Sequence, residues 1–103
     1  MTLRELVERL DELDDGLTLY AKGGIGAGAD SPAVAAFEPE DGSVPPEAAG
    51  MSYVLEVLGA LEVVEVWSEW RDGREPTTDD MLEAILHYAK NDAYLPTEAG
   101  EYD

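Results

Sequence analysis

The sequence predicts an α+β domain in which three helices pack with a small two-stranded β-ribbon. Apolar residues recur every three or four positions in three segments, as they do on the buried face of a helix. Those segments are about residues 2–13, 51–71 and 78–93. Two shorter segments, about 17–22 and 33–37, flank a glycine-rich loop and are typical of strands. The 103 residues fit one domain, which we place at 1–95, followed by a polar tail at 96–103.

The first and third helices begin at recognisable caps. Thr2 is followed three residues later by Glu5, which is the spacing of a capping box. The DDG sequence at 14–16 then ends the first helix. Thr77 stands in the same relation to Asp80, so we expect the third helix to begin near Thr77 with acids at its positive end.

The first predicted strand, LTLYAK at 17–22, alternates apolar and polar side chains. The GGIGAG sequence that follows lacks two features of phosphate-binding loops: a helix directly after the last glycine, and a Gly-Lys-Ser/Thr ending. We therefore expect it to join two strands that pair across it. Residues 38–50 contain three prolines and four acids and are predicted to be a loop.

The longest apolar-rich segment, 51–71, is predicted to be the central helix. Projected at about 100° per residue, it is apolar around most of its circumference. One face instead carries an acidic row, consisting of Glu62, Glu65, Glu69 and Asp72. Like charges at that spacing repel one another. The acidic row is therefore either a solvated face or a docking face for a basic partner, with Trp70 beside it as an aromatic anchor.

Charge and composition argue against several classes of function. The chain has 24 Asp and Glu against 6 Lys and Arg, a formal net charge of −18, and no Cys. Nucleic acids and anionic membranes both require Lys and Arg, so we expect neither as a partner. Without Cys, and with one His, no disulfide, metal site or other cofactor is expected. The charged amphipathic N-terminus is unlike a secretory signal, which predicts a cytoplasmic protein.

The acidity has a simple explanation, because net charge keeps a small protein soluble and monomeric. Three hypotheses for the function stand beside it. The first is a non-enzymatic interaction protein that presents the acidic row to a basic protein, in the manner of immunity proteins, inhibitors or DNA mimics. The second is a small-ligand site with a cleft around Glu56 and Asp92. The third is that the charge reflects a saline cytoplasm and carries no functional message. No motif has catalytic spacing, so we do not expect an enzyme, and both monomer and homodimer stay open.

The ligand-site hypothesis depends on two acids that fall among apolar positions. In the helical projection, Glu56 lies on the apolar side of the long helix and Asp92 lies on the core stripe of the third. A buried carboxylate needs a partner. The two acids would therefore line a cleft, with Tyr20 and Tyr53 nearby, form a structural hydrogen bond or ion pair, or be protonated. Alternatively, the apolar faces are narrower than this projection draws them, and the two acids lie outside them.

From Gly50 onward, the motifs GMSYVLEVLGALEVVEVW, RDGREPT and AILHYAKNDAYLP resemble a family of small acidic bacterial domains of unknown function. The resemblance covers the last half of the chain and the LTLYAK segment. Such domains have no assigned activity, so the resemblance implies no catalytic residue, cofactor or partner.

Overall fold

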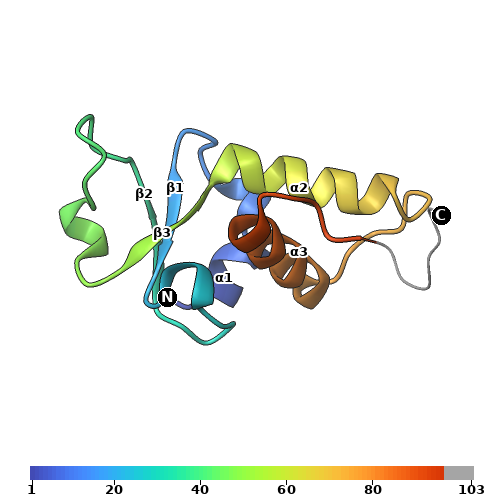
Figure 1. The fold of residues 1–103 in the computed structure, drawn as a ribbon, viewed down its shortest axis with the longest axis horizontal. Helices are drawn as coiled ribbons and strands as arrows, with labels where there is room; N and C mark the ends of the chain where they lie inside the picture. Colours follow the sequence, from blue (N-terminus) through green and yellow to red (C-terminus); the bar gives the residue numbers. More distant parts are fainter. Residues whose placement is uncertain (97–103) are drawn as a thin grey trace.

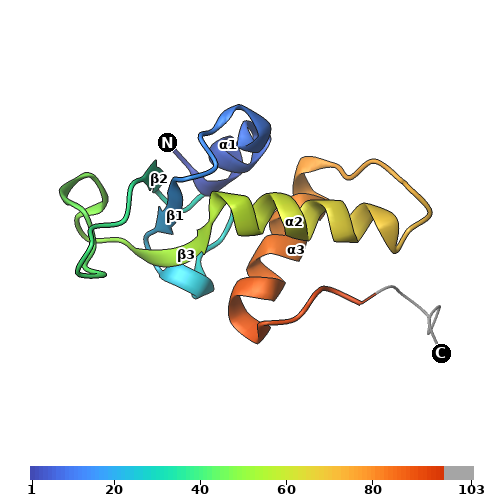
Figure 2. The same ribbon diagram turned by 90° about the horizontal axis from the view of Figure 1, so that it is seen from above.

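A three-stranded antiparallel sheet lies at one end of the molecule, and the helices extend from it (Figures 1 and 2). The structure is a computed structural model that describes residues 1–96. Its strands are β1 (Thr18–Ala21), β2 (Ala33–Ala36) and β3 (Ser52–Glu56), in the spatial order β2-β1-β3. Its helices are α1 (Leu3–Glu8), α2 (Val57–Glu69) and α3 (Thr78–Asn91). Short 3-10 turns occupy Leu10–Glu12, Gly24–Gly26 and Pro46–Ala48.

The predicted α+β class is confirmed, and the two predicted strands pair antiparallel, with Tyr20 opposite Val34. The expected two-stranded ribbon is wrong because the sheet has a third strand. Residues 52–56, assigned to the long helix, form β3 and pair with the other edge of β1, where Tyr20 lies opposite Tyr53. The prediction failed there because residues 51–71 are apolar around most of the predicted circumference, so no clear period separates strand from helix.

β3 passes directly into α2. Glu56 is both the last residue of the strand and the N-cap of the helix. The N–H of Val57 donates a hydrogen bond to the carbonyl of Leu17, across 2.9 Å, at this junction. The helix expected at 51–71 therefore spans only Val57–Glu69.

Both predicted capping boxes are present. The Thr2 hydroxyl accepts a hydrogen bond from the N–H of Glu5, and the Glu5 carboxylate accepts one from the N–H of Thr2. Thr77 and Asp80 make the same two bonds at the start of α3. The first helix is shorter than expected, since it changes to a 3-10 turn after Glu8. Of the predicted polar tail, only Pro96 lies within the described residues.

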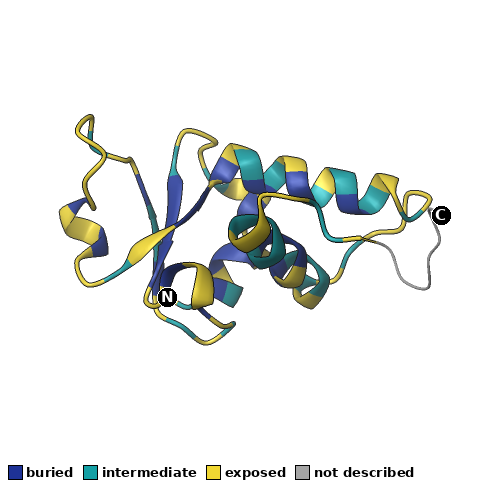
Figure 3. Ribbon diagram, in the orientation of Figure 1, coloured by how far each residue is buried: buried dark blue, intermediate teal, exposed yellow. Residues whose placement is uncertain are grey.

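β1 is buried on both faces, which Figure 3 shows as a dark strand along its whole length. One face packs on the main core, which is formed with the three helices. The other is covered by the proline-rich loop at 38–50, where Tyr20, Ala36 and Ala48 form a second, smaller cluster. The loop thus closes the sheet face that the helices leave open.

Backbone hydrogen bonds join the N-terminal residues to the end of the glycine-rich loop and the start of β2. The N–H of Leu3 donates to the carbonyl of Ser31, and the N–H of Ala33 donates to the carbonyl of Met1. Gly24 adopts a positive φ of 55°, and a Cβ there would lie 3.0 Å from the Cβ of Ser52. Glycine at this position is therefore required both by the backbone conformation and by the close approach to β3.

Candidate functional site

Three of the four acids in the acidic row lie on the face of α2 that points away from the core. Glu62, Glu65 and Glu69 are exposed, and their spacing extends back to Leu58, whose side chain is 59% exposed. Asp72 is also exposed and lies just past the end of the helix, with a positive φ of 60°. The structure therefore presents a continuous exposed stripe that begins with a leucine and continues with carboxylates.

An aromatic cluster lies beside this stripe. Trp70, 48% exposed, meets the ring of Tyr94 edge to face at 5.8 Å, and Tyr94 lies 5.2 Å from the ring of Tyr88. The chain returns along α2 after α3 (red in Figure 1), so that the Tyr94 hydroxyl donates to Glu62 Oε1 at 2.8 Å. This hydrogen bond raises the pKa of Tyr94, and partial burial and the Glu62 charge add to the rise.

A groove of about 280 Å³, the α1–α2 groove, lies next to the same helix. Its aliphatic floor is formed by Val7, Leu10, Leu61, Val64, Pro76 and Met81. Its rim is formed by three exposed carboxylates, Glu8, Asp11 and Glu75. No Lys or Arg lines it. The groove combines an apolar surface with negative charge.

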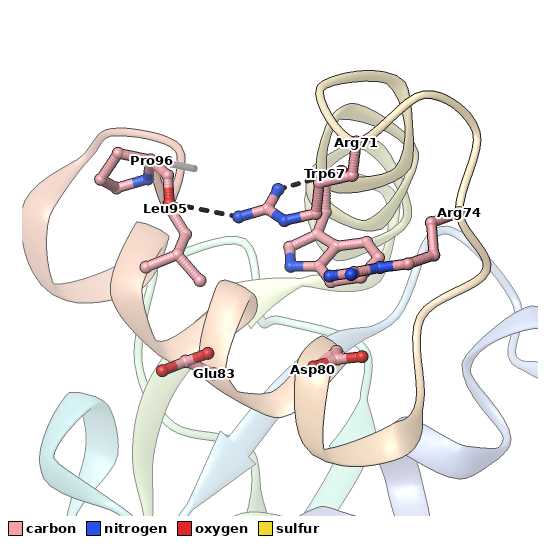
Figure 4. Close-up of a pocket in the computed structure, with 7 residues that line it drawn as sticks. All are labelled: Trp67, Arg71, Arg74, Asp80, Glu83, Leu95 and Pro96. Atoms are coloured by element: carbon pink, nitrogen blue, oxygen red, sulfur yellow. Dashed lines mark hydrogen bonds between the residues drawn. The ribbon is translucent and has the colours of Figure 1, made fainter. Parts of the chain in front are cut away.

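Two of the four arginines meet at the C-terminal end of α2 (Figure 4). The guanidinium carbons of Arg71 and Arg74 lie 4.4 and 5.0 Å from the centroid of the Trp67 ring. Arg71 also donates to the carbonyls of Trp67 and Pro96, at 3.0 and 3.2 Å. Through these two hydrogen bonds, Arg71 holds Pro96 next to the C-terminal end of α2.

These arginines line a pocket of about 130 Å³, the arginine pocket, together with Asp80 and Glu83. The two carboxylates lie across the pocket from the guanidinium groups (Figure 4). Because they offset the positive charge, the pocket offers little net attraction for an anion. Its geometry supports a structural role for Arg71 rather than a binding site.

The structure does not place Glu56 and Asp92 among core residues. Both side chains are exposed, Glu56 at the N-cap of α2 and Asp92 in the left-handed conformation that ends α3. The projection was wrong because it continued helical geometry through residues 52–56 and beyond Asn91, where the chain is not helical. Neither carboxylate lines the α1–α2 groove or the arginine pocket.

The two tyrosines of the predicted cleft do come together. The rings of Tyr20 and Tyr53 meet edge to face, 6.5 Å apart, next to the second cluster. Tyr20 is 1% exposed, and its hydroxyl has no hydrogen-bond partner among residues 1–96. Burial raises the pKa of Tyr20, and the charge of Glu38 adds to the rise. Burial also raises the pKa of Tyr53, as does the charge of Glu56.

Negative charge is not confined to α2. Every carboxylate within residues 1–96 is exposed except that of Asp80, which is half-buried. The one ion pair found in this part of the chain joins Arg4 to Asp79 at 2.6 Å.

Residues 1–96 contain no group of three His, Asp or Glu side chains placed to hold a metal ion. Nor do they form any helix with the length and apolarity that crossing a bilayer requires.

Sequence reasoning missed Leu58 and the α1–α2 groove. Leu58 precedes Glu62 by four residues, so the helical period alone would have placed it on the face of the acidic row. The groove had no such signal, because its walls come from segments far apart in the sequence.

Comparison of the chain with protein-family models, with curated proteins and with solved structures finds no match.

Proposed function

We propose that this protein is a non-enzymatic, cytoplasmic interaction protein that binds a basic protein partner through the acidic row of α2, in the manner of an immunity protein, an inhibitor or a DNA mimic. One observation carries the proposal. The stripe formed by Leu58, Glu62, Glu65 and Glu69 is exposed, and no Lys or Arg interrupts it anywhere in α2.

The electrostatics of the free protein support this function. The ion pair found within residues 1–96 lies elsewhere, so the repulsion between Glu62, Glu65 and Glu69 is not relieved by a neighbouring cation there. Cations of a partner would relieve it, and the same field would accelerate the encounter. The exposed apolar side chains of Leu58 and Trp70 would supply contact area that excludes water.

The proposal is tested with an octalysine peptide as a basic probe at low salt. The row variant replaces Glu62, Glu65 and Glu69 with Gln. A matched variant replaces three exposed acids outside α2 with Gln, namely Glu38, Glu40 and Glu47. Both variants change the net charge by the same amount, and in the row variant Gln keeps an amide oxygen that can accept the hydrogen bond that Tyr94 donates to Glu62.

We expect the row variant to weaken binding by about tenfold, or roughly 0.5 kcal/mol per charge, when measured by fluorescence anisotropy. The matched variant should weaken it by less than about threefold. Equal losses of affinity in the two variants would contradict the proposal, because they would mean that binding depends on the total charge and not on the α2 face.

A second candidate is adaptation to a saline cytoplasm. The wide distribution of exposed carboxylates over the described elements favours it. It predicts equal losses in the two variants, and it predicts that the folded state requires molar salt. The ligand-site hypothesis has no comparable support, since neither Glu56 nor Asp92 is buried.

A further inference from the structure

We propose that the α1–α2 groove is the anchor site for one long cationic side chain, an arginine or a lysine, of the basic partner. This inference rests on the proposed function and identifies the chemistry that the partner must present. It depends on four features of the groove: its floor, its rim, its size and its position beside the acidic row.

The floor suits the aliphatic stem of such a side chain. Leu61 and Val64 of α2 are only partly buried, as is Met81 of α3, so they offer apolar surface that water now covers. Each methylene moved from water onto such a floor improves affinity by about fourfold. Met81 is unbranched and adapts its conformation to a ligand more readily than a branched side chain does.

The rim suits the charged head. Glu8, Asp11 and Glu75 come from three different segments and converge on one groove. All three are exposed, so a cation bound between them would keep part of its hydration and would not bear the cost of full burial. Lys and Arg side chains commonly bind in this way to surfaces that are partly apolar and partly charged, with the aliphatic stem on the apolar part and the charged head at the edge.

Size and charge distinguish this groove from its neighbours. Its volume of about 280 Å³ is just below the range of roughly 300–1,000 Å³ that is typical of small-molecule pockets. Two other pockets of the described chain contain arginine, which would repel a cation: Arg9 lines a pocket of about 450 Å³, and Arg71 and Arg74 line the arginine pocket. The groove is therefore the better match for a single cationic side chain.

The groove is continuous with the proposed docking face. Leu61 lies on its floor and Glu65 belongs to the acidic row, and the two are one helical turn apart on α2. A basic segment lying along the row would therefore place a neighbouring side chain at the groove. The row would attract the partner, and the groove would determine which side chain is anchored.

The three methionines of the chain make this inference testable on the full protein. Met81 lines the groove, whereas Met1 and Met51 both line the 450 Å³ pocket. With ¹³C-labelled methionine methyl groups, Met81 reports on the groove and the other two are internal controls. The probes are octalysine and the same peptide made of 2,4-diaminobutyric acid, whose stem is two methylenes shorter, both studied at pH 6, where both amines are charged.

We expect octalysine to shift the Met81 methyl signal and to leave those of Met1 and Met51 in place. It should bind about tenfold more tightly than the short-stemmed peptide, because the stem gains contact with the floor. Replacing Glu8 and Glu75 with Gln should reduce that ratio, since the head is then no longer held at the rim. The row variant should weaken both peptides alike and leave the ratio unchanged.

Equal affinity for the two peptides, or a shift of Met1 and Met51 in place of Met81, would overturn the inference. If the row variant still weakened binding in that case, the proposed function would stand without the groove. Conversely, a preserved ratio and Met81 shift, together with a row variant that binds normally, would support the groove and contradict the proposed role of the acidic row.

Discussion

The hydroxyl of Tyr20 is buried without a hydrogen-bond partner among residues 1–96, although buried hydroxyl groups normally have one. Its ring is packed between Tyr53 and the small cluster with Ala36 and Ala48. Burial of the ring stabilises the fold, while burial of the unbonded oxygen opposes it. The two effects can be separated by removing the oxygen alone.

Tyr20→Phe should raise the free energy of unfolding by about 1 kcal/mol, because it removes a buried polar group that has lost its bond to water. Urea unfolding followed by circular dichroism measures the change. Tyr53→Phe is the matched control, since its side chain is 43% exposed, and it should alter stability by less than about 0.5 kcal/mol. A loss of about 1 kcal/mol or more in Tyr20→Phe would show that the hydroxyl is bonded in solution.

At the residue scale, the predictions based on short sequence motifs were confirmed, whereas those based on a helical projection were wrong. The Thr2–Glu5 and Thr77–Asp80 caps depend only on residues three apart, and both are present. The burial of Glu56 and Asp92 depended on where each helix begins and ends, and both are exposed. An error of a few residues in a helix boundary is therefore enough to move a carboxylate from core to surface.

At the element scale, α2 is held by the segment that follows α3. Tyr94 donates to Glu62 from that segment, and Arg71 donates back to the carbonyl of Pro96. The bond from Tyr94 requires a protonated phenol. Its raised pKa means that the bond is intact below the ordinary tyrosine pKa of about 10 and is lost as the pH rises through the higher value in the folded state.

Absorbance titration at 295 nm, taken as the difference between the wild type and Tyr94→Phe, should give Tyr94 a pKa above 10. In a Glu62→Ala background the same difference should fall back toward 10, because both the acceptor and the negative charge are gone. Glu65→Ala, which removes a neighbouring acid of the same helix, should leave it nearly unchanged. If the two backgrounds shift the titration equally, Tyr94 senses general charge rather than Glu62.

The element that sequence reasoning misassigned is β3. Ser52–Glu56 and α2 are contiguous, so one apolar-rich segment contains a strand and a helix, with Glu56 at the junction and no Gly or Pro between them. Pairing with β1 is what makes residues 52–56 extended, and that pairing is a tertiary contact. The two other strands were predictable because turn residues bound them on both sides.

At the scale of the whole molecule, charge repulsion adds to the conformational entropy that opposes folding. The described chain exposes nearly all of its carboxylates and forms one ion pair in that range. Net charge of this size destabilises a compact state through self-repulsion. Salt reduces that repulsion, because the screening length falls from about 30 Å at 0.01 M to about 10 Å at 0.1 M.

The melting temperature should rise by about 5 °C, equivalent to ~1 kcal/mol, between 10 mM and 0.5 M KCl. Thermal melts followed by circular dichroism measure it. The chain should already be folded at 10 mM, and the rise should level off as screening becomes complete. A chain that folds only at molar KCl would favour the saline explanation and would remove the main support for a docking role.

The candidate surface was predictable only in part. The acidic row follows from the helical period, which depends on the sequence of one element. The α1–α2 groove depends on how α1, α2 and the start of α3 pack together, and the sequence of no single element contains that information. Surfaces formed along one helix are accessible to sequence reasoning, whereas surfaces formed between helices are not.

The direct passage from β3 into α2 has a kinetic consequence. No flexible residue separates strand from helix, and the hydrogen bond from Val57 to Leu17 fixes the junction. The face that carries the acidic row is therefore oriented rigidly with respect to the sheet before any partner arrives. Binding of the proposed basic partner is therefore expected to need no change at this junction, and steering by the acidic row should make the association rate fall as ionic strength rises.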